Sequence, residues 1–195
     1  MKLWVLALTD ATTSDLVLLV YPLVQLIVGV IKLANNIKYF PFHLKCFNLL
    51  TMINAKTGQF VPAAQYLLQP FDSSHIEYFN AKPRALQDKS IPDTTISLKV
   101  AKKHVETQEI KDRIVKESLE ALTLYLAANA TSLSFPELFV PIGVVLRKFK
   151  KNIGNSNYRK MVTSFLELIQ RHEDLIAQTR AKIKDKSLRD PAKLH

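Results

Sequence analysis

An apolar run near the amino terminus constrains the fold of this chain more than any other feature. Its main part, VYPLVQLIVGVIKL (residues 20–33), contains one charged residue, Lys32. A helix that crosses a bilayer needs about 20 mostly apolar residues, whereas this run is interrupted by Pro22, Gln25 and Gly29. The run is too short and too interrupted for a membrane span. It predicts a helix that is covered on almost every face inside a stack of helices.

The first residues do not resemble a secretion signal. After Met1 and Lys2 the apolar stretch LWVLAL is followed at once by the polar stretch TDATTSD, while the apolar core of a signal peptide has roughly 7 to 15 residues. The single cysteine, Cys46, has no partner for an internal disulfide and forms no zinc pattern. We therefore expect a reducing compartment such as the cytosol or the nucleus.

Proline, glycine and asparagine divide the chain into segments with helical periodicity, so we expect an all-α fold. A composition of 48% hydrophobic residues with four glycines is that of a folded chain, and 195 residues suffice for one domain with a core. After a short first piece at residues 2–8, the expected helices cover approximately residues 15–34, 41–58, 61–70, 109–129, 135–154 and 157–186.

An aromatic residue followed shortly by proline and an apolar helix recurs along the chain, in YPLVQLI, FVPAAQYLL and FVPIGVVLRKF. Such openings of buried helices are typical of a HEAT or armadillo-like α-solenoid of stacked antiparallel helix pairs, in which each pair buries its apolar face against its neighbours. The spacing is not strictly periodic. We expect residues 20–33 to be a central helix of this solenoid.

We expect one continuous solenoid domain with an irregular insertion. Residues 1–70 form the first helical repeats, residues 71–107 an irregular connecting segment, residues 108–186 the C-terminal repeats with a basic end, and residues 187–195 a tail. The connecting segment contains TTISLKV, for which we expect a short extended or helical piece. Connections of this length in compact domains usually bind something or wrap a neighbour.

The formal charge of +10 is concentrated at the carboxyl end. Residues 147–195 contain 13 Lys and Arg against 5 Asp and Glu. This asymmetry fits an acidic partner, most commonly a polyphosphate. It equally fits a solvated, lysine-rich last helix.

No pattern for chemistry is present. His43 and Cys46 share a helix three residues apart, but a thiol beside an imidazole in an apolar stretch is usually plain packing. The other histidines lack metal-binding spacing, and no phosphate-binding glycine loop occurs. We expect no catalytic residue, metal, cofactor or small-molecule substrate.

The remaining candidate for a functional site is the basic stretch RKFKKNIGNSNYRKM at a turn between two helices. Phe149 and Tyr158 are interleaved with its charges, and we expect both rings in the core. The charges are expected to contact RNA or an acidic protein by holding phosphates or carboxylates without reading bases. The predicted contact residues are Arg147, Lys148, Lys150, Lys151, Arg159 and Lys160.

Several stretches resemble the nucleolar complex protein two family. They are LWVLALTD, LVYPLVQLIVGVIKL, YFPFHLKCFNLLTMINAKTGQFVPAAQYLL and TLYLAANATSLSFPELFVPIGVVLRKFKKNIGNSNYRKMV. The likeness covers residues 3–176 and is weakest over residues 71–99. The motif residues that we expect to have structural roles are Tyr21, Pro22, Gln25, Gly58, Pro62, Phe135, Pro136, Glu137, Pro141 and Tyr158. We expect Gln25 and Glu137 to satisfy backbone groups at helix ends.

The resemblance implies an all-helical HEAT-like fold without catalytic activity, found in the nucleolus and nucleoplasm. It implies a heterodimer with one of two related nucleolar complex proteins, and a place on precursors of the large ribosomal subunit (pre-60S) during maturation and transport. Because family members are normally much longer, the chain is expected to correspond to a C-terminal part or to a reduced homologue.

Other function classes remain open on the residues alone. A HEAT-like adaptor in transport or trafficking would bind peptides in a groove, and an acidic inner groove would favour it. A protein anchored in a membrane by residues 16–33 comes next, and an enzyme comes last because its site would need residues that the sequence scatters.

Overall fold

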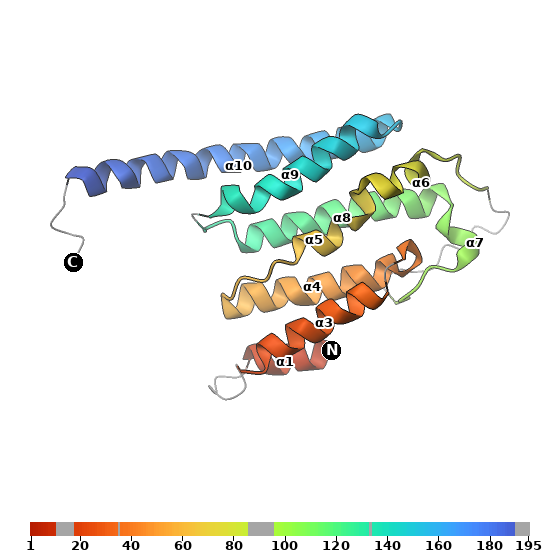
Figure 1. The fold of residues 1–195 in the computed structure, drawn as a ribbon, viewed down its shortest axis with the longest axis horizontal. Coiled ribbons are helices and arrows are strands. Elements are labelled where there is room, and N and C mark those ends of the chain that lie inside the picture. The colour runs from red at the N-terminus through yellow and green to blue at the C-terminus, as the bar shows by residue number, and fades with distance from the viewer. Residues whose placement is uncertain (11–17, 35, 86–95, 133, 190–195) are drawn as a thin grey trace.

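All regular secondary structure in the described part of the chain is helical, which confirms the all-α prediction (Figure 1). The computed structural model describes residues 1–10, 18–34, 36–85, 96–132 and 134–189. None of the helices in these ranges combines the length and the apolarity that a membrane crossing needs.

In chain order the elements are α1 (Lys2–Asp10), α3 (Val20–Leu33), the 3₁₀ helix η1 (Ile37–Tyr39), α4 (Phe40–Thr57), α5 (Ala64–Leu67), η2 (Gln69–Phe71), η3 (Ser73–His75), α6 (Ile76–Asn80), α7 (Lys102–Val105), α8 (Gln108–Ala128), α9 (Phe135–Asn152) and α10 (Ser156–Arg189).

The longer helices lie side by side in a row, from α1 and α3 through α4 and α8 to α9 and α10 (Figure 1). α4 packs against α1, α3 and α8, and α10 packs against α8 and α9. The short helix α5 contacts both α4 and α8. Each long helix therefore buries its apolar face mainly against its neighbours in the row.

Helix α3 is covered on one side only. Val20, Leu23, Ile27 and Ile31 form the buried stripe that faces the rest of the protein. The expectation that almost every face of residues 20–33 is covered is wrong for this chain, because α3 lies at one end of the row and packs against α1 and α4. The predicted start near residue 15 lies outside the described residues.

Helix α4 begins and ends where the sequence predicts. Pro41 lies in its first turn, where a missing N–H costs nothing. Gly58 caps its carboxyl end with φ 67°, and the Gly58 N–H donates to the carbonyl of Asn54 at 3.1 Å. This left-handed conformation favours glycine over any residue with a Cβ.

The helix predicted over residues 61–70 is shorter than expected and is limited to α5 and η2. Just before α5, two side chains form hydrogen bonds with the backbone of Val61. The Val61 N–H donates to Asn54 Oδ1 at 3.2 Å, and Tyr125 Oη donates to the Val61 carbonyl at 2.8 Å. These side-chain hydrogen bonds take the place of the backbone hydrogen bonds of a helix, so Val61 is not part of α5.

The segment between residues 71 and 107 contains η3, α6 and α7, all short. Within TTISLKV, residues 96–100 form neither helix nor strand, and the earlier positions lie outside the described residues.

The three C-terminal helices follow the predicted periodicity closely. The apolar stripe on α8, which includes Ile110, Leu122 and Tyr125, is buried throughout. On α10, Phe165 and Ile169 are buried, whereas Leu168 is 53% exposed and does not belong to the core stripe.

Candidate functional site

The predicted basic residues gather at the turn between α9 and α10. Lys150 is partly buried, and the side chains of Arg147, Lys148, Lys151, Arg159 and Lys160 are exposed. We call this set of six residues the basic edge. Residues 147–160 contain no Asp or Glu, so no acidic residue within the turn itself offsets these charges.

Polar side chains shape the turn. α9 ends at Ile153, which takes an extended conformation with φ −80° and ψ 132°. Arg159 Nε donates to the carbonyl of Ile153 at 2.7 Å, and Asn155 Oδ1 accepts from the Asn157 N–H at 2.9 Å. Arg159 is therefore partly structural, because it satisfies a carbonyl just beyond the helix end.

The aromatic residues of this stretch belong to the core. Phe149 and Tyr158 are fully buried, in agreement with the expectation. The ring of Phe149 makes edge-on contacts with Phe71 and Phe79 at centroid distances of 5.0 and 5.5 Å. The charged residues of the basic edge thus lie next to aromatic rings that are packed in the core.

A polar network fixes the start of α10. Tyr158 Oη donates to Asp112 Oδ1 at 2.6 Å, and Gln108 Nε2 donates to Tyr158 Oη at 2.9 Å. Burial and the Asp112 carboxylate raise the pKa of Tyr158 above its usual value. Asp112, an exposed carboxylate close to the basic edge, is thereby held by hydrogen bonds from Tyr158 and Gln108.

A second set of exposed side chains lies on α1, on α3 and at the two residues before α3, and it is apolar. It contains Leu3, Trp4, Leu18, Leu19, Tyr21, Leu26 and Leu33, with exposed fractions from 45% to 88%. We call these residues the apolar face. Helical spacing relates Leu19, just before α3, to Pro22, Leu26 and Leu33 on α3. This helix therefore carries an exposed apolar stripe as well as a buried one.

Three motif residues accompany the apolar face. Tyr21, Pro22 and Gln25 are exposed, and the expected structural roles of Tyr21 and Pro22 stay predictions. Gln25 lies in the sixth position of α3 and not at a helix end, so its expected role in satisfying end groups is wrong.

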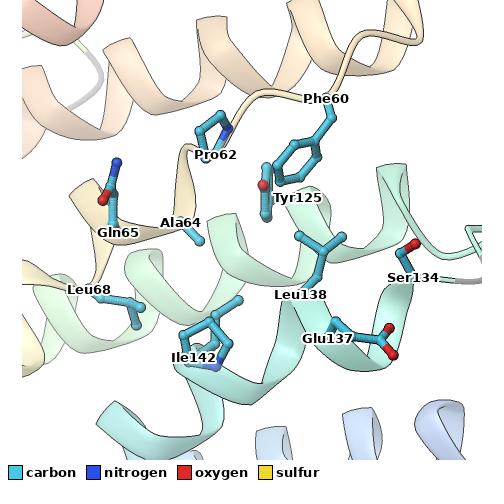
Figure 2. Close-up of a pocket in the computed structure, with 11 residues that line it drawn as sticks. Phe60, Pro62, Ala64, Gln65, Leu68, Tyr125, Ser134, Glu137, Leu138 and Ile142 are labelled. Atoms are coloured by element: carbon cyan, nitrogen blue, oxygen red, sulfur yellow. The ribbon is translucent and has the colours of Figure 1, made fainter.

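An open cavity of about 430 Å³ lies between the connection after α4, α8 and the start of α9 (Figure 2). Figure 2 shows Phe60 and Tyr125 together on one side, with Leu138 pointing from α9 towards them. Its lining residues are Phe60, Pro62, Ala64, Gln65, Leu68, Tyr125, Ser134, Glu137, Leu138, Pro141 and Ile142. Two motif stretches far apart in the sequence, around Pro62 and around Glu137, therefore meet here.

Glu137 lies in the first turn of α9, close to the helix end where we expected it to act. It forms a two-point ion pair with Arg180 of α10, with nitrogen–oxygen distances of 2.8 and 2.5 Å. The hydrogen bonds from Arg180 and from its own backbone N–H lower the pKa of Glu137. Nearby, the buried ring of Phe135 meets His172 edge-on at 4.6 Å.

His43 and Cys46 do not form a reactive pair in this structure. His43 Nε2 bonds to the carbonyl of Ala34 at 2.9 Å, beyond the end of α3. Burial raises the pKa of the Cys46 thiol to about 11, away from the thiolate that a nucleophile needs. No group of three or more His, Cys, Asp or Glu within the described ranges is arranged to hold a metal ion.

One residue that contacts the turn between α9 and α10 is not among the predicted site residues. Asn80, at the end of α6, bonds to both Asn152 and Gly154 in the α9–α10 turn. A contact between positions so far apart in the sequence leaves no periodic signal. Tertiary structure alone brings this segment to the site.

The sequence model of the Noc2p family matches residues 1–192. The chain belongs to the Noc2p family. Nucleolar complex protein 2 of Drosophila melanogaster is 30% identical over 183 residues, which cover 93% of this chain and 23% of that protein. Nucleolar complex-associated protein 2 of Arabidopsis thaliana is 30% identical over 186 residues, which cover 94% of this chain and 24% of that protein.

A more distant member, the nucleolar complex protein 2 homolog of Caenorhabditis elegans, is 23% identical over 172 residues, covering 86% of this chain and 24% of that protein. The chain spans about a quarter of the length of these curated Noc2p relatives.

Proposed function

We propose that this Noc2p-family chain is a non-enzymatic scaffold in the assembly of the large ribosomal subunit and in the movement of pre-60S particles within the nucleus. Support comes from family membership and from relatives whose names place them in nucleolar complexes. In this proposal the chain works in the nucleolus and nucleoplasm and takes part in rRNA maturation without a catalytic site of its own.

The proposal includes a HEAT-like solenoid of antiparallel helix pairs, with residues 1–70 and 108–186 as repeats of one continuous domain around the connecting segment 71–107. The row of helices in Figure 1 supports this architecture, since α4 packs on α3 and α8, and α10 packs on α8 and α9. A solenoid presents a long surface on which several partners can assemble.

The observation that carries the scaffold proposal is the separation of two exposed surfaces with different chemistry. The apolar face lies on α1 and α3, and the basic edge lies at the other end of the row, between α9 and α10. Contiguous exposed apolar side chains mark sites of protein association. We propose that a related nucleolar complex protein packs on the apolar face as the next helices of a joint solenoid.

The basic edge is proposed to contact precursor rRNA or an acidic protein of the particle. Its charges and the amides of the turn suit phosphate oxygens, which are held by charge and hydrogen bonds without base recognition.

The alternative of a peptide-binding adaptor has weaker support. The cavity beside Tyr125 is lined mainly by apolar side chains, and Glu137 at its rim is paired with Arg180. This cavity lacks the acidic inner surface that would favour the adaptor.

The test is affinity purification of the tagged chain from its own cells, before and after RNase treatment, with mass spectrometry and RNA sequencing. We expect large-subunit proteins, precursor rRNA and a second nucleolar complex protein, the last of which survives RNase. Recovery of transport receptors or membrane proteins in their place would overturn the proposal.

Two variants separate the surfaces in the same purification. Leu26→Glu places a charge in the apolar face and is expected to remove the nucleolar complex partner. Reversal of four charges to Glu, at Arg147, Lys148, Lys151 and Lys160, is expected to weaken association with the particle and to keep that partner. Normal co-sedimentation of the folded charge-reversed variant would remove the RNA part of the proposal.

A further inference from the structure

The basic edge is joined to other cationic segments at the same end of the molecule. The first is the stretch after α6. Asn80 Oδ1 accepts from the Gly154 N–H at 2.8 Å, and Asn80 Nδ2 donates to the Asn152 carbonyl at 3.2 Å. One side chain thus holds the α9–α10 turn by a donor and an acceptor, and the exposed Lys82 and Arg84 follow it in the sequence.

The same stretch is held from its other side. The Arg84 N–H donates to the carbonyl of Glu106 at 3.0 Å, and Lys111 Nζ donates to the carbonyl of Ala81 at 2.8 Å. Lys111 is buried and also lies over the ring of Tyr78 at 5.0 Å. Residues 80–84 therefore form a fixed bridge between the α9–α10 turn and the junction of α7 with α8.

A further backbone hydrogen bond connects the segment before α7 to η1. The N–H of Val100, two residues before α7, donates to the carbonyl of Lys38 at 2.8 Å. Lys99 and Lys102, on either side of Val100, are exposed. Figure 1 shows the α9–α10 turn, α6 and α7 along one edge of the row, where the ends of successive helices lie (right in Figure 1).

Positive charge dominates these linked segments. Residues 80–84 and 99–103 contain Lys82, Arg84, Lys99, Lys102 and Lys103 without any Asp or Glu. We call the basic edge together with these residues and Lys38 the basic rim. Exposed carboxylates also occur along this edge, at Glu77, Glu106, Glu109 and Asp112, so the rim consists of cationic segments separated by a few acids.

The side chains at the rim suit phosphates better than bases or apolar protein anchors. Among the described residues, the aromatic side chains with more than half of their surface exposed are Trp4, Tyr21 and Phe60. These rings lie on α1, α3 and the connection after α4, away from the rim. Proteins that bind single strands stack bases on exposed rings, and protein interfaces centre on aromatic anchors.

We propose that the basic rim binds the phosphate backbone of double-helical RNA along one edge of the helix row, with Lys82, Arg84 and Lys102 as contacts beyond the α9–α10 turn. The inference rests on the proposed function and extends it, because it assigns the partner and adds a segment to the site. Double-helical RNA is recognised mostly through its shape and its phosphates, so a rigid row of cations without exposed rings is suited to it.

The experiment measures binding of the full chain to a labelled RNA duplex of about 20 base pairs by fluorescence anisotropy, between about 50 and 200 mM salt. The test variant is Lys82→Gln with Arg84→Gln. We expect a roughly three- to tenfold loss of affinity and a decrease of about two in the slope of log K against log salt, about one for each cation removed. The same variant should lose little affinity for a single strand of equal length.

The matched control removes two exposed lysines away from the rim, by Lys56→Gln at the carboxyl end of α4 with Lys116→Gln on α8. This control is expected to keep the affinity and the salt slope of the unchanged protein. Circular dichroism checks that each variant is folded, which we expect because the altered side chains are exposed.

The outcomes separate this inference from the proposed function. If the four charge reversals in the basic edge abolish duplex binding while Lys82→Gln with Arg84→Gln matches the control, the extended rim is wrong and the scaffold proposal stands. If the chain prefers polyglutamate or single strands to the duplex, the assignment of double-helical RNA is overturned. Loss of precursor rRNA from the purified particle in the charge-reversed variant tests the scaffold proposal independently.

Discussion

Tyr158 and Asp112 join the starts of two long helices that are far apart in the sequence. Tyr158 Oη, near the start of α10, donates to Asp112 Oδ1, near the start of α8, at 2.6 Å. The ring is fully buried and meets Phe79 edge-on at a centroid distance of 6.0 Å. The packing of this residue and its hydrogen bond therefore both hold the basic edge against the rest of the protein.

We predict that Tyr158→Phe lowers the free energy of unfolding by about 1.5–3 kcal/mol, because the hydrogen bond to a charged group is lost while the ring stays in place. Urea denaturation followed by circular dichroism measures this change. Tyr66→Phe is the control, since Tyr66 is partly buried, and we expect a change within about 0.5 kcal/mol. Equal stability of the two variants would contradict the role of the bond.

The two glycines Gly58 and Gly29 are predicted to respond to alanine in opposite directions. An added Cβ meets no atom within 4 Å at either position, but Gly58 has a positive φ and Gly29 lies inside α3. We expect Gly58→Ala to cost about 1–2 kcal/mol through backbone strain. Gly29→Ala should stabilise the protein by about 0.5–1 kcal/mol. Thermal unfolding of both variants shows whether the signs differ.

Neighbouring positions on α3 provide a test of which stripe belongs to the core. Ile27 is completely buried and Leu26 is 64% exposed. We predict that Ile27→Ala lowers the free energy of unfolding by about 2–5 kcal/mol, and that Leu26→Ala changes it by less than about 0.5 kcal/mol. A large loss in the purified Leu26→Ala chain would mean that the exposed stripe is covered within this protein.

Stability is predicted to fall in mild acid because of His43. Burial lowers the pKa of His43 below its usual 6.5, and the hydrogen bond to Ala34 only partly opposes this effect. Above about pH 6.5 the imidazole is neutral in both states. Below that pH the unfolded chain takes up the proton first, so the free energy of unfolding decreases as the pH falls towards the lowered pKa.

Denaturant titrations from neutral pH down to about pH 5 measure this dependence. His43→Gln is expected to flatten the profile in this range, whereas His75→Gln provides a matched control on η3. An unchanged slope in His43→Gln would show that another group causes the loss.

Local rules in the sequence account for most of the helices. Prolines at the first turns of α4 and α9, and glycine after α4, define these ends through backbone geometry that needs no distant partner. The stripe on α8 is equally local, because its period places one face in the core wherever the helix packs. The charged turn of the basic edge is also visible directly in the sequence.

Long-range contacts decide what these rules leave open. The sequence of α3 is apolar on two sides, and only the position of α3 in the row determines that Ile27 is covered and Leu26 is not. The short length of α5 depends on Asn54 and Tyr125, which capture the backbone of Val61 from other helices. Such bonds join residues whose separation in the sequence carries no regular period.

The sequence by itself determined an all-helical Noc2p-family chain with a basic turn near its carboxyl end. The tertiary structure decided which surfaces remain exposed and which segments share them. Asn80 lies beside Gly154 only because α6 packs at the end of α9, so the extent of the basic rim follows from packing. Hydrophobic periodicity relates residues that are close in the sequence and lie on one helix. A surface, in contrast, combines residues from several elements that are distant in the sequence and adjacent in the fold.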